Sequence, residues 1–236
     1  MIMKLLSICK KIFFLGSTIL AISFCQITLA QTTSVSEFVH KVYVSGIPYD
    51  EASQYKSSDV PFLIQMLEDP NEKPYWANIA LLLEIIGDEK ALSSLIAFIE
   101  RDPGGELTES HYVAKTSAIM GLGYLINKSN SKKALNYLVA GASPDAWEKR
   151  KITGLTTKWH ATVEERNLDM AKYAILGLAL AGTKESGQAL LRLQTQAASS
   201  TNIAAQQEAG VISQALSEHQ KIVNEGLSGY YKKNHR

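Results

Sequence analysis

The histidines are the side chains of this sequence best suited to acid–base or metal chemistry, but they are scattered along the chain. A zinc site on a helix needs two ligands at i, i+4 on one face, plus a third ligand. His160 and Glu164 have the i, i+4 spacing, yet no third ligand is nearby in the sequence. A solvated polar pair near a helix start is therefore favoured. The five histidines are His40, His111, His160, His219 and His235.

Two short motifs resemble catalytic or cofactor signatures by chance. Residues 53–56 read Ser-Gln-Tyr-Lys and fit the Ser-x-x-Lys of penicillin-recognising enzymes, but the Ser-Asp-Asn and Lys-Thr-Gly elements are absent. Gly121 and Gly123 begin like a dinucleotide fingerprint, but no strand precedes them and no third glycine follows. Their better explanation is close helix packing. The sequence thus predicts no catalytic residue, no cofactor site and no metal site.

Aromatic and basic side chains gather around three predicted loops. Each loop follows a helix and begins with an Asp-Pro or Ser-Pro pair, at residues 69, 102 and 143, where proline stops the helix. The third loop, an insertion over 143–163, is much the longest, and loops of this length are often functional. Aromatic residues and arginine are typical of recognition sites, although these aromatics would also pack the loops onto the helix ends. The candidate partner-binding residues are Trp76, Tyr112, Lys115, Trp147, Lys149, Arg150, Lys151, Trp159 and His160.

The segments that must position these residues have helical periodicity throughout. Val60, Leu63, Ile64 and Leu67 fall at i, i+3, i+4 and i+7, the spacing of one apolar helix face. The same spacing recurs in the segments 92–99 and 135–142 and in part around Leu190. No run of alternating strand residues is present. The sequence predicts an all-α protein.

A second type of helix alternates with these and is self-similar. Residues 75–88, 114–127 and 170–183 read YWANIALLLEIIGD, AKTSAIMGLGYLIN and MAKYAILGLALAGT. Leu83, Leu122 and Leu178 then align, and the preceding position is glycine in two of the three copies. Glycine inside a helix costs about 1 kcal/mol relative to alanine, so its repeated use indicates close approach of neighbouring helices.

The two helix types combine into about four predicted pairs that repeat roughly every 40 residues. Such repetition is typical of stacked helical solenoids, in which each pair covers the apolar face of the next. The predicted pairs are 59–68 with 73–87, 89–101 with 109–126, 131–142 with about 164–182, and 184–197 with about 202–219.

The turn over residues 86–92, Ile-Gly-Asp-Glu-Lys-Ala-Leu, resembles that of the HEAT-like repeats related to those of phycobilisome lyases. Residues 122–125 and 181–183 match parts of the pattern, whereas Ile126-Asn127 lacks its glycine. The resemblance covers about residues 58–200 and implies a right-handed α-α superhelix of the HEAT/armadillo type. It implies that the second helices line the concave side, with Trp76 and Lys115. Members of that family serve as scaffolds, as enzyme accessories and as lyases, so the resemblance transfers no catalytic residue.

The first thirty residues have the layout of a secretory signal peptide. Basic Lys4, Lys10 and Lys11 precede an apolar run over 12–24, and a small-residue exit ends at Ala30. The run is shorter than the roughly 20 residues of a spanning helix, which disfavours an uncleaved anchor. Phe24 before Cys25 disfavours a lipoprotein signal. Since Cys9 and Cys25 both lie in this segment, the exported chain would have no thiol.

The domain organisation predicted from these patterns has four parts. A signal peptide (1–30) and an N-terminal capping segment (31–57) precede the repeat domain (58–219), and a last helix with a basic tail (220–236) follows. With 24 basic and 23 acidic residues, no charge excess points to nucleic acid. We expect an exported periplasmic or secreted scaffold or adaptor that binds a protein, with no membrane span after cleavage. Two alternatives are an enzyme or accessory factor acting under the 143–163 insertion, and envelope association through the basic tail.

Overall fold

The chain folds into helices joined by short turns. The computed structural model describes residues 33–234 apart from 45, 151, 157 and 200–202, so the predicted signal peptide (1–30) lies outside the described residues. Within those ranges the only extended pairing is an isolated bridge between Val44 and Gly46. The predicted all-α class is confirmed. None of the helices in this part of the chain has both the length and the apolar character required to cross a membrane.

The described α-helices follow the predicted order. They are α2 (Val35–Val39), α3 (Tyr49–Ala52), α4 (Val60–Glu68), α5 (Trp76–Ile86), α6 (Leu92–Glu100), α7 (Glu109–Ser129), α8 (Lys132–Gly141), α9 (Pro144–Lys149), α10 (Val163–Ala181), α11 (Lys184–Ser199) and α12 (Ile203–Asn234). Three short 3₁₀ helices join them at Ser57–Asp59, Pro70–Tyr75 and Glu89–Ala91.

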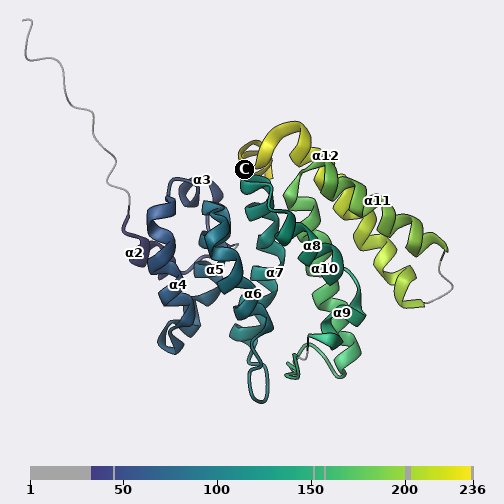
Figure 1. The fold of residues 1–236 in the computed structure, drawn as a ribbon, viewed down its shortest axis with the longest axis horizontal. Coiled ribbons are helices and arrows are strands. Elements are labelled where there is room, and N and C mark those ends of the chain that lie inside the picture. Colours follow the sequence, from purple (N-terminus) through teal and green to yellow (C-terminus); the bar gives the residue numbers. More distant parts are fainter. Residues whose placement is uncertain (1–32, 45, 151, 157, 200–202, 235–236) are drawn as a thin grey trace, which may run out of the picture. The chain divides into compact units, whose positions relative to one another are not determined.

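The long helices α5, α7, α10 and α12 pack against one another in chain order, α7 lying between α5 and α10 and α10 between α7 and α12. Helices α4, α6, α8 and α11 each pack against a neighbour of this series (Figure 1). The three leucines aligned in the sequence, Leu83, Leu122 and Leu178, have no exposed surface. They therefore lie in the shared core, as their alignment predicted.

Two glycines decide how closely α7 and α10 approach. A Cβ atom on Gly123 would overlap with the carbonyl oxygen of Gly177, and a Cβ on Gly177 would lie 2.9 Å from the carbonyl oxygen of Met120. Backbone therefore contacts backbone across this helix pair. The predicted close packing of these glycines is confirmed. The dinucleotide fingerprint has no structural counterpart, since Gly121 and Gly123 both lie within α7.

Helix ends account for the missing glycine of the second repeat. Gly87 and Gly182 end α5 and α10 in the left-handed conformation, with φ of 72° and 56°. Helix α7 instead continues through Ile126-Asn127 and ends at Asn130, which has φ of 55°. Asparagine tolerates this conformation better than other residues with a Cβ. The turn is thus shifted four residues along the chain, from Ile126 to Asn130, and is not lost.

The sequence predicted one long loop over residues 143–163, but part of this insertion is helical. Pro144 does not only stop α8; it begins the short helix α9, where proline is tolerated because the first turn needs no amide donor. Residues 153–156 of the insertion lie against the 102–108 loop. Leu107 N donates to Leu155 O at 3.1 Å, and Thr156 Oγ1 donates to Leu107 O at 2.8 Å. Two of the three predicted loops therefore contact each other.

The C-terminal segment is helical, as predicted, and it also contacts the N-terminal capping segment. Helix α12 runs to Asn234 with a kink at Gly226, whose φ of 68° and ψ of 165° are non-helical. After the kink the chain reaches the N-terminal capping segment, where the Tyr231 ring stacks on Tyr49 at 5.3 Å between centroids. Ser228 Oγ also donates to Asp50 Oδ1 at 2.6 Å. His235 and Arg236 lie outside the described residues.

Candidate functional site

The three tryptophans among the candidate partner-binding residues differ sharply in exposure. Trp76 is 4% exposed and Trp147 is 0% exposed, whereas Trp159 is 52% exposed. An enclosed indole offers no surface to a partner. Trp159 is therefore the one tryptophan of the three that is accessible, since all of them belong to the described residues.

Trp76 is part of a buried cluster at the start of α5 and α7. Its Nε1 donates to Asp69 O at 3.2 Å, and its ring contacts Phe98 and His111 at centroid distances of 5.4 and 4.9 Å. Burial, followed by the charges of Lys115, Lys73 and Arg101, lowers the pKa of His111 to about 4. The His111 ring is thus neutral at pH 7 and packs like an aromatic residue.

Lys115 closes the end of α6 instead of facing a concave surface. It is fully buried, and its Nζ donates to the carbonyl oxygens of Phe98, Ile99 and Arg101 at 3.0, 2.7 and 2.7 Å. Carbonyls at a helix C-terminus have no intrahelical donor and attract cations. Burial is the main cause that lowers the pKa of Lys115 to about 7, and Arg101 lowers it further. Its role in this conformation is to cap α6.

Trp147 and Arg150 fix the insertion to α8. Trp147 Nε1 donates to Gly141 O at 2.7 Å. The Arg150 guanidinium lies between two rings, 3.9 Å from the Tyr137 centroid and 4.2 Å from that of Trp147. Both side chains are therefore used within the protein, as the packing alternative for these aromatics proposed. Lys149 is exposed, and Lys151 lies outside the described residues.

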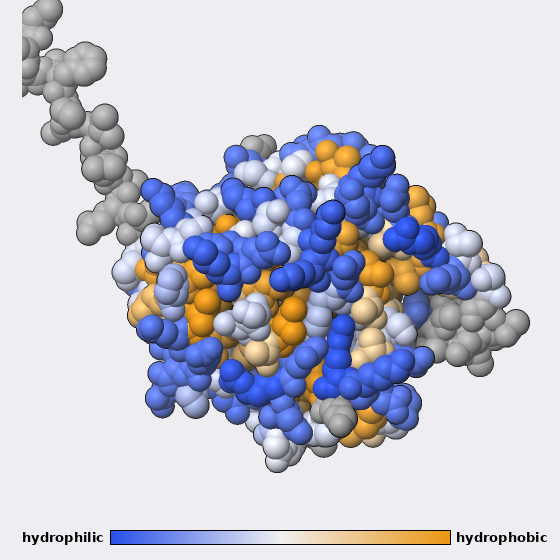
Figure 2. Space-filling model, in the orientation of Figure 1, coloured by the Kyte–Doolittle hydropathy of each residue, from blue (hydrophilic) through white to orange (hydrophobic). Residues whose placement is uncertain are grey.

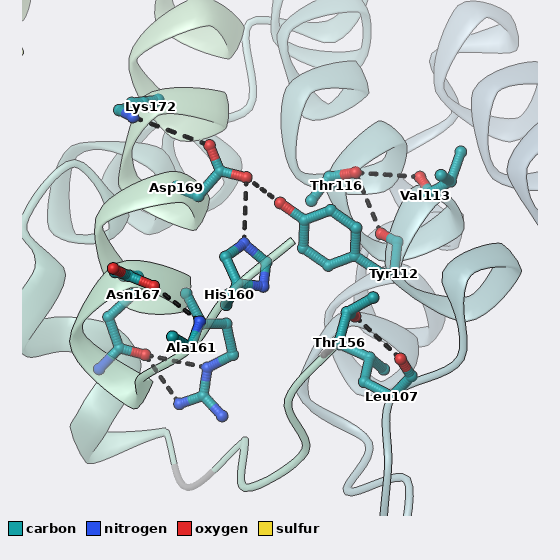
Figure 3. Close-up of polar contacts among 12 residues, drawn as sticks. Leu107, Tyr112, Val113, Thr116, Thr156, His160, Ala161, Asn167, Asp169 and Lys172 are labelled. Atoms are coloured by element: carbon teal, nitrogen blue, oxygen red, sulfur yellow. Dashed lines mark hydrogen bonds and ion pairs between the residues drawn. The ribbon is translucent and has the colours of Figure 1, made fainter. Parts of the chain in front are cut away.

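His160, Tyr112 and Asp169 meet where the insertion, α7 and α10 come together (Figure 3). The Tyr112 hydroxyl donates to Asp169 Oδ2, and His160 Nε2 lies 3.4 Å from the same oxygen. The rings of Tyr112 and His160 meet edge to face at 4.9 Å. Burial, then the hydrogen bond and charge of Asp169, raises the pKa of Tyr112, so its hydroxyl stays protonated and remains a donor. We call these three residues the Asp169 cluster.

A shallow hollow of about 350 Å³ opens beside the Asp169 cluster. Lys172 Nζ lies 3.9 Å from Asp169 Oδ1, and Lys158 Nζ lies 5.1 Å from the Trp159 ring centroid. Carboxylate, ammonium and indole groups are therefore all available at one place on the surface. The hollow is lined by Trp159, His160, Glu165, Leu168, Asp169 and Lys172.

The i, i+4 pair of His160 and Glu164 does not form a ligand pair on one helix. Helix α10 begins at Val163 with Thr162 as its cap, so His160 precedes the helix and turns towards Asp169. Glu164 is exposed. Across the described ranges, no group of three His, Cys, Asp or Glu side chains lies close enough together to hold a metal ion.

Ser186 and His219 are close enough to suggest a nucleophile and its base, with Oγ and Nε2 3.1 Å apart. However, His219 Nε2 also lies 2.9 Å from the carbonyl oxygen of Thr183, which can only accept. Nε2 must therefore carry the proton, and it is not free to take one from Ser186. Ser186 N in turn donates to Thr183 Oγ1 at 3.2 Å at the start of α11. The pair stabilises a helix start.

Three candidate residues, Tyr112, Trp159 and His160, are brought together by the fold. Two further residues of this site, Asp169 and Lys172, were not predicted from the sequence. No sequence signal marked Asp169, because its partner Tyr112 is 57 residues away. Comparison with known protein families, curated proteins and solved structures finds no match to this chain. The fold and the site therefore define a helical protein with a polar-aromatic surface site, and its further classification rests on its own residues.

Proposed function

We propose that this protein is an exported scaffold or adaptor, built as a right-handed α-α solenoid of the HEAT/armadillo type, that binds another protein at the surface around Trp159. The solenoid is supported by the order of packing, because α5, α7, α10 and α12 each contact the next in the series. It is also supported by the equal burial of Leu83, Leu122 and Leu178 in three successive copies. A stack of this kind offers extended edges for recognition.

The observation that carries the binding proposal is the 52% exposure of Trp159 on a well-anchored support. Its neighbour His160 contacts Asp169 within the Asp169 cluster, and Lys158 pairs with Glu109 of α7 at 2.8 Å. An indole that is exposed yet held in place loses little conformational entropy on binding, and tryptophan is enriched among residues that dominate binding energy.

The partner surface that fits this site combines an apolar side chain with polar neighbours. The apolar group would cover Trp159 and Leu168, while Glu165 and Lys172 would meet groups of opposite charge. On the face drawn in Figure 2, hydrophobic residues occur in separate groups between hydrophilic ones. Such a surface suits a localised contact with a segment of another protein, more than a broad apolar interface.

The test is capture of partners from the native envelope by the Trp159→Ala protein, with bound proteins identified by mass spectrometry. The matched control is Phe62→Ala, because Phe62 is an aromatic residue of α4 with a similar exposure of 47%. A specific partner should be lost with Trp159→Ala and retained with Phe62→Ala. Equal capture by both variants would remove the Trp159 surface from consideration.

Export is proposed from the sequence of residues 1–30 alone. The measurement is the intact mass and N-terminal sequence of the protein recovered from the native cells. A mature chain beginning at Gln31 supports the proposal, and a chain that retains residues 1–30 contradicts it.

A further inference from the structure

A second hollow, of about 470 Å³, shares no lining residue with the Trp159 surface. It is lined by residues of α5 and α7, of the N-terminal capping segment and of the end of α12. Its apolar lining includes Ile47, Leu81, Ile85 and Met120. A hollow of this size with apolar walls is within the range of small-molecule sites.

Three tyrosine rings line this hollow and contact one another. Tyr49 lies 5.3 Å from Tyr231 and 5.8 Å from Tyr124, centroid to centroid, and the hydroxyls of Tyr124 and Tyr231 are hydrogen-bonded to each other. The three residues come from α3, α7 and α12, so only the folded chain assembles them. Tyrosine ring faces carry negative electrostatic potential and attract cations, quaternary ammonium groups above all.

A carboxyl group with no partner lies near Tyr124, one of these three residues. Glu84 of α5 is fully buried, and neither of its carboxyl oxygens has a hydrogen-bond partner. The carboxyl occupies the space where Gly121 of α7 has no side chain, so that a Cβ there would overlap with Glu84 Oε2. An unpaired buried carboxyl is costly, and a native structure that keeps one requires an explanation.

Residues that line the hollow flank Glu84 on both helices. Leu81 and Ile85 stand three residues before it and one after it on α5. On α7, the Glu84 carboxyl contacts Gly121. Two lining residues flank this glycine, Met120 one residue before it and Tyr124 three residues after it. The carboxyl is therefore one layer of side chains from the hollow. Burial raises the pKa of Glu84 well above its usual value, so the group is neutral unless a positive charge comes close.

Few other charges face this site. Tyr124 is the titratable group of α7 beside Glu84, and Tyr49 and Tyr231 are those of α3 and α12. Asp50 and Lys232 line the hollow and lie 3.9 Å apart, where they largely neutralise each other. No cation in the described part of the chain pairs with Glu84, since neither of its oxygens has a partner.

We infer that this hollow binds a quaternary ammonium compound, with the cation against the cluster of Tyr49, Tyr124 and Tyr231 and with Glu84 as its counter-charge. The apolar side chains would contact the rest of the ligand. Binding brings a positive charge to a neutral carboxyl, and ionised Glu84 is then favoured. One proton should therefore be released for each cation bound.

The test is isothermal titration calorimetry of the full protein with choline as the probe, in two buffers of different ionisation enthalpy. A quaternary cation has no proton to lose, so released protons must come from the protein. Across a pH series, we expect choline binding to release protons wherever Glu84 is protonated in the free protein, and we expect the affinity to rise with pH over that range. Choline that fails to bind, or binds without proton release, overturns the inference.

The neutral isostere 3,3-dimethylbutan-1-ol separates charge from shape. It should bind at least about tenfold more weakly than choline if the rings and Glu84 recognise the cation. Equal binding of the two probes would show that the hollow selects apolar shape alone and would overturn the inference.

Two sets of variants locate the site. Glu84→Gln preserves size and neutrality, and it should abolish proton release and weaken choline binding about tenfold, with an unchanged circular dichroism spectrum. Tyr49→Leu should weaken binding, while Tyr49→Phe, which keeps the ring face, should not. Retained proton release in Glu84→Gln, or equal affinity in the two Tyr49 variants, would contradict this assignment.

Discussion

The hydroxyl of Tyr112 on α7 donates a hydrogen bond to Oδ2 of Asp169 on α10, and this bond joins two core helices beneath the insertion. His160 of the insertion reaches the same carboxylate at 3.4 Å. One acceptor thus holds three separate parts of the chain together. The support of Trp159 depends on this carboxylate, because His160 is the next residue.

The Tyr112–Asp169 bond predicts a measurable coupling. Tyr112→Phe and Asp169→Asn should each lower the free energy of unfolding by about 1–3 kcal/mol, because hydrogen bonds to a charged acceptor have this worth. Urea unfolding of both single variants and the double variant measures the effect. The double variant should lose less than the sum of the two, and strict additivity would show that the bond is not energetically formed.

The close approach of α7 and α10 predicts a strong position effect for alanine. Gly123→Ala should destabilise the protein by about 3 kcal/mol, because its methyl group would overlap with the Gly177 carbonyl and push the helices apart. Gly210→Ala on α12 is the matched control, since no atom lies within 4 Å of its Cβ position. That change should stabilise by about 0.5–1 kcal/mol through helix propensity alone. Thermal unfolding compares the two, and a tolerated Gly123→Ala would disprove the contact.

The two insertion tryptophans should respond oppositely to truncation. Trp147→Ala should lower the free energy of unfolding by about 3–5 kcal/mol, because it empties a fully buried site and removes the stacking partner of Arg150. Trp159→Ala should change it by less than about 0.5 kcal/mol, since half of that side chain is already solvated. Chemical denaturation of both variants tests this. Similar losses in both would mean that Trp159 also packs as a core residue.

His111 predicts a loss of stability in mild acid. Its folded pKa of about 4 lies below the ordinary value of 6.5. Between these values the unfolded chain binds a proton that the folded chain does not. The stabilisation is therefore complete above about pH 6.5 and is lost as the pH falls towards 4, by about 2 kcal/mol.

The measurement for His111 is the free energy of unfolding from pH 7 to 4, for the natural protein and for His111→Phe. Phenylalanine keeps the aromatic contacts with Trp76 and Phe98 but cannot titrate. As the pH is lowered from 7 to 4, the free energy of unfolding should fall by about 2 kcal/mol more for the natural protein than for His111→Phe. Parallel curves would mean that folding does not lower the pKa of His111.

The sequence by itself determined the helical class and most helix boundaries. Repeated apolar spacing specifies a helix through local geometry, so the segments around Leu83, Leu122 and Leu178 could be aligned without a structure. Gly87 and Gly182 likewise marked turns, because the backbone preference of glycine is local. The small residues at Gly121 and Gly177 correctly indicated close helix packing.

Only the tertiary structure decided which side chains are available for function. Exposure depends on contacts between residues distant in sequence, and the pattern around Trp147 and Trp159 gave no reason to separate them. Lys115 became a helix cap and Asp169 became the centre of a cluster through partners on other helices. Glu84 is a single carboxyl within an apolar helix, but its lack of a partner and its place near Tyr124 exist only once α5 and α7 have met.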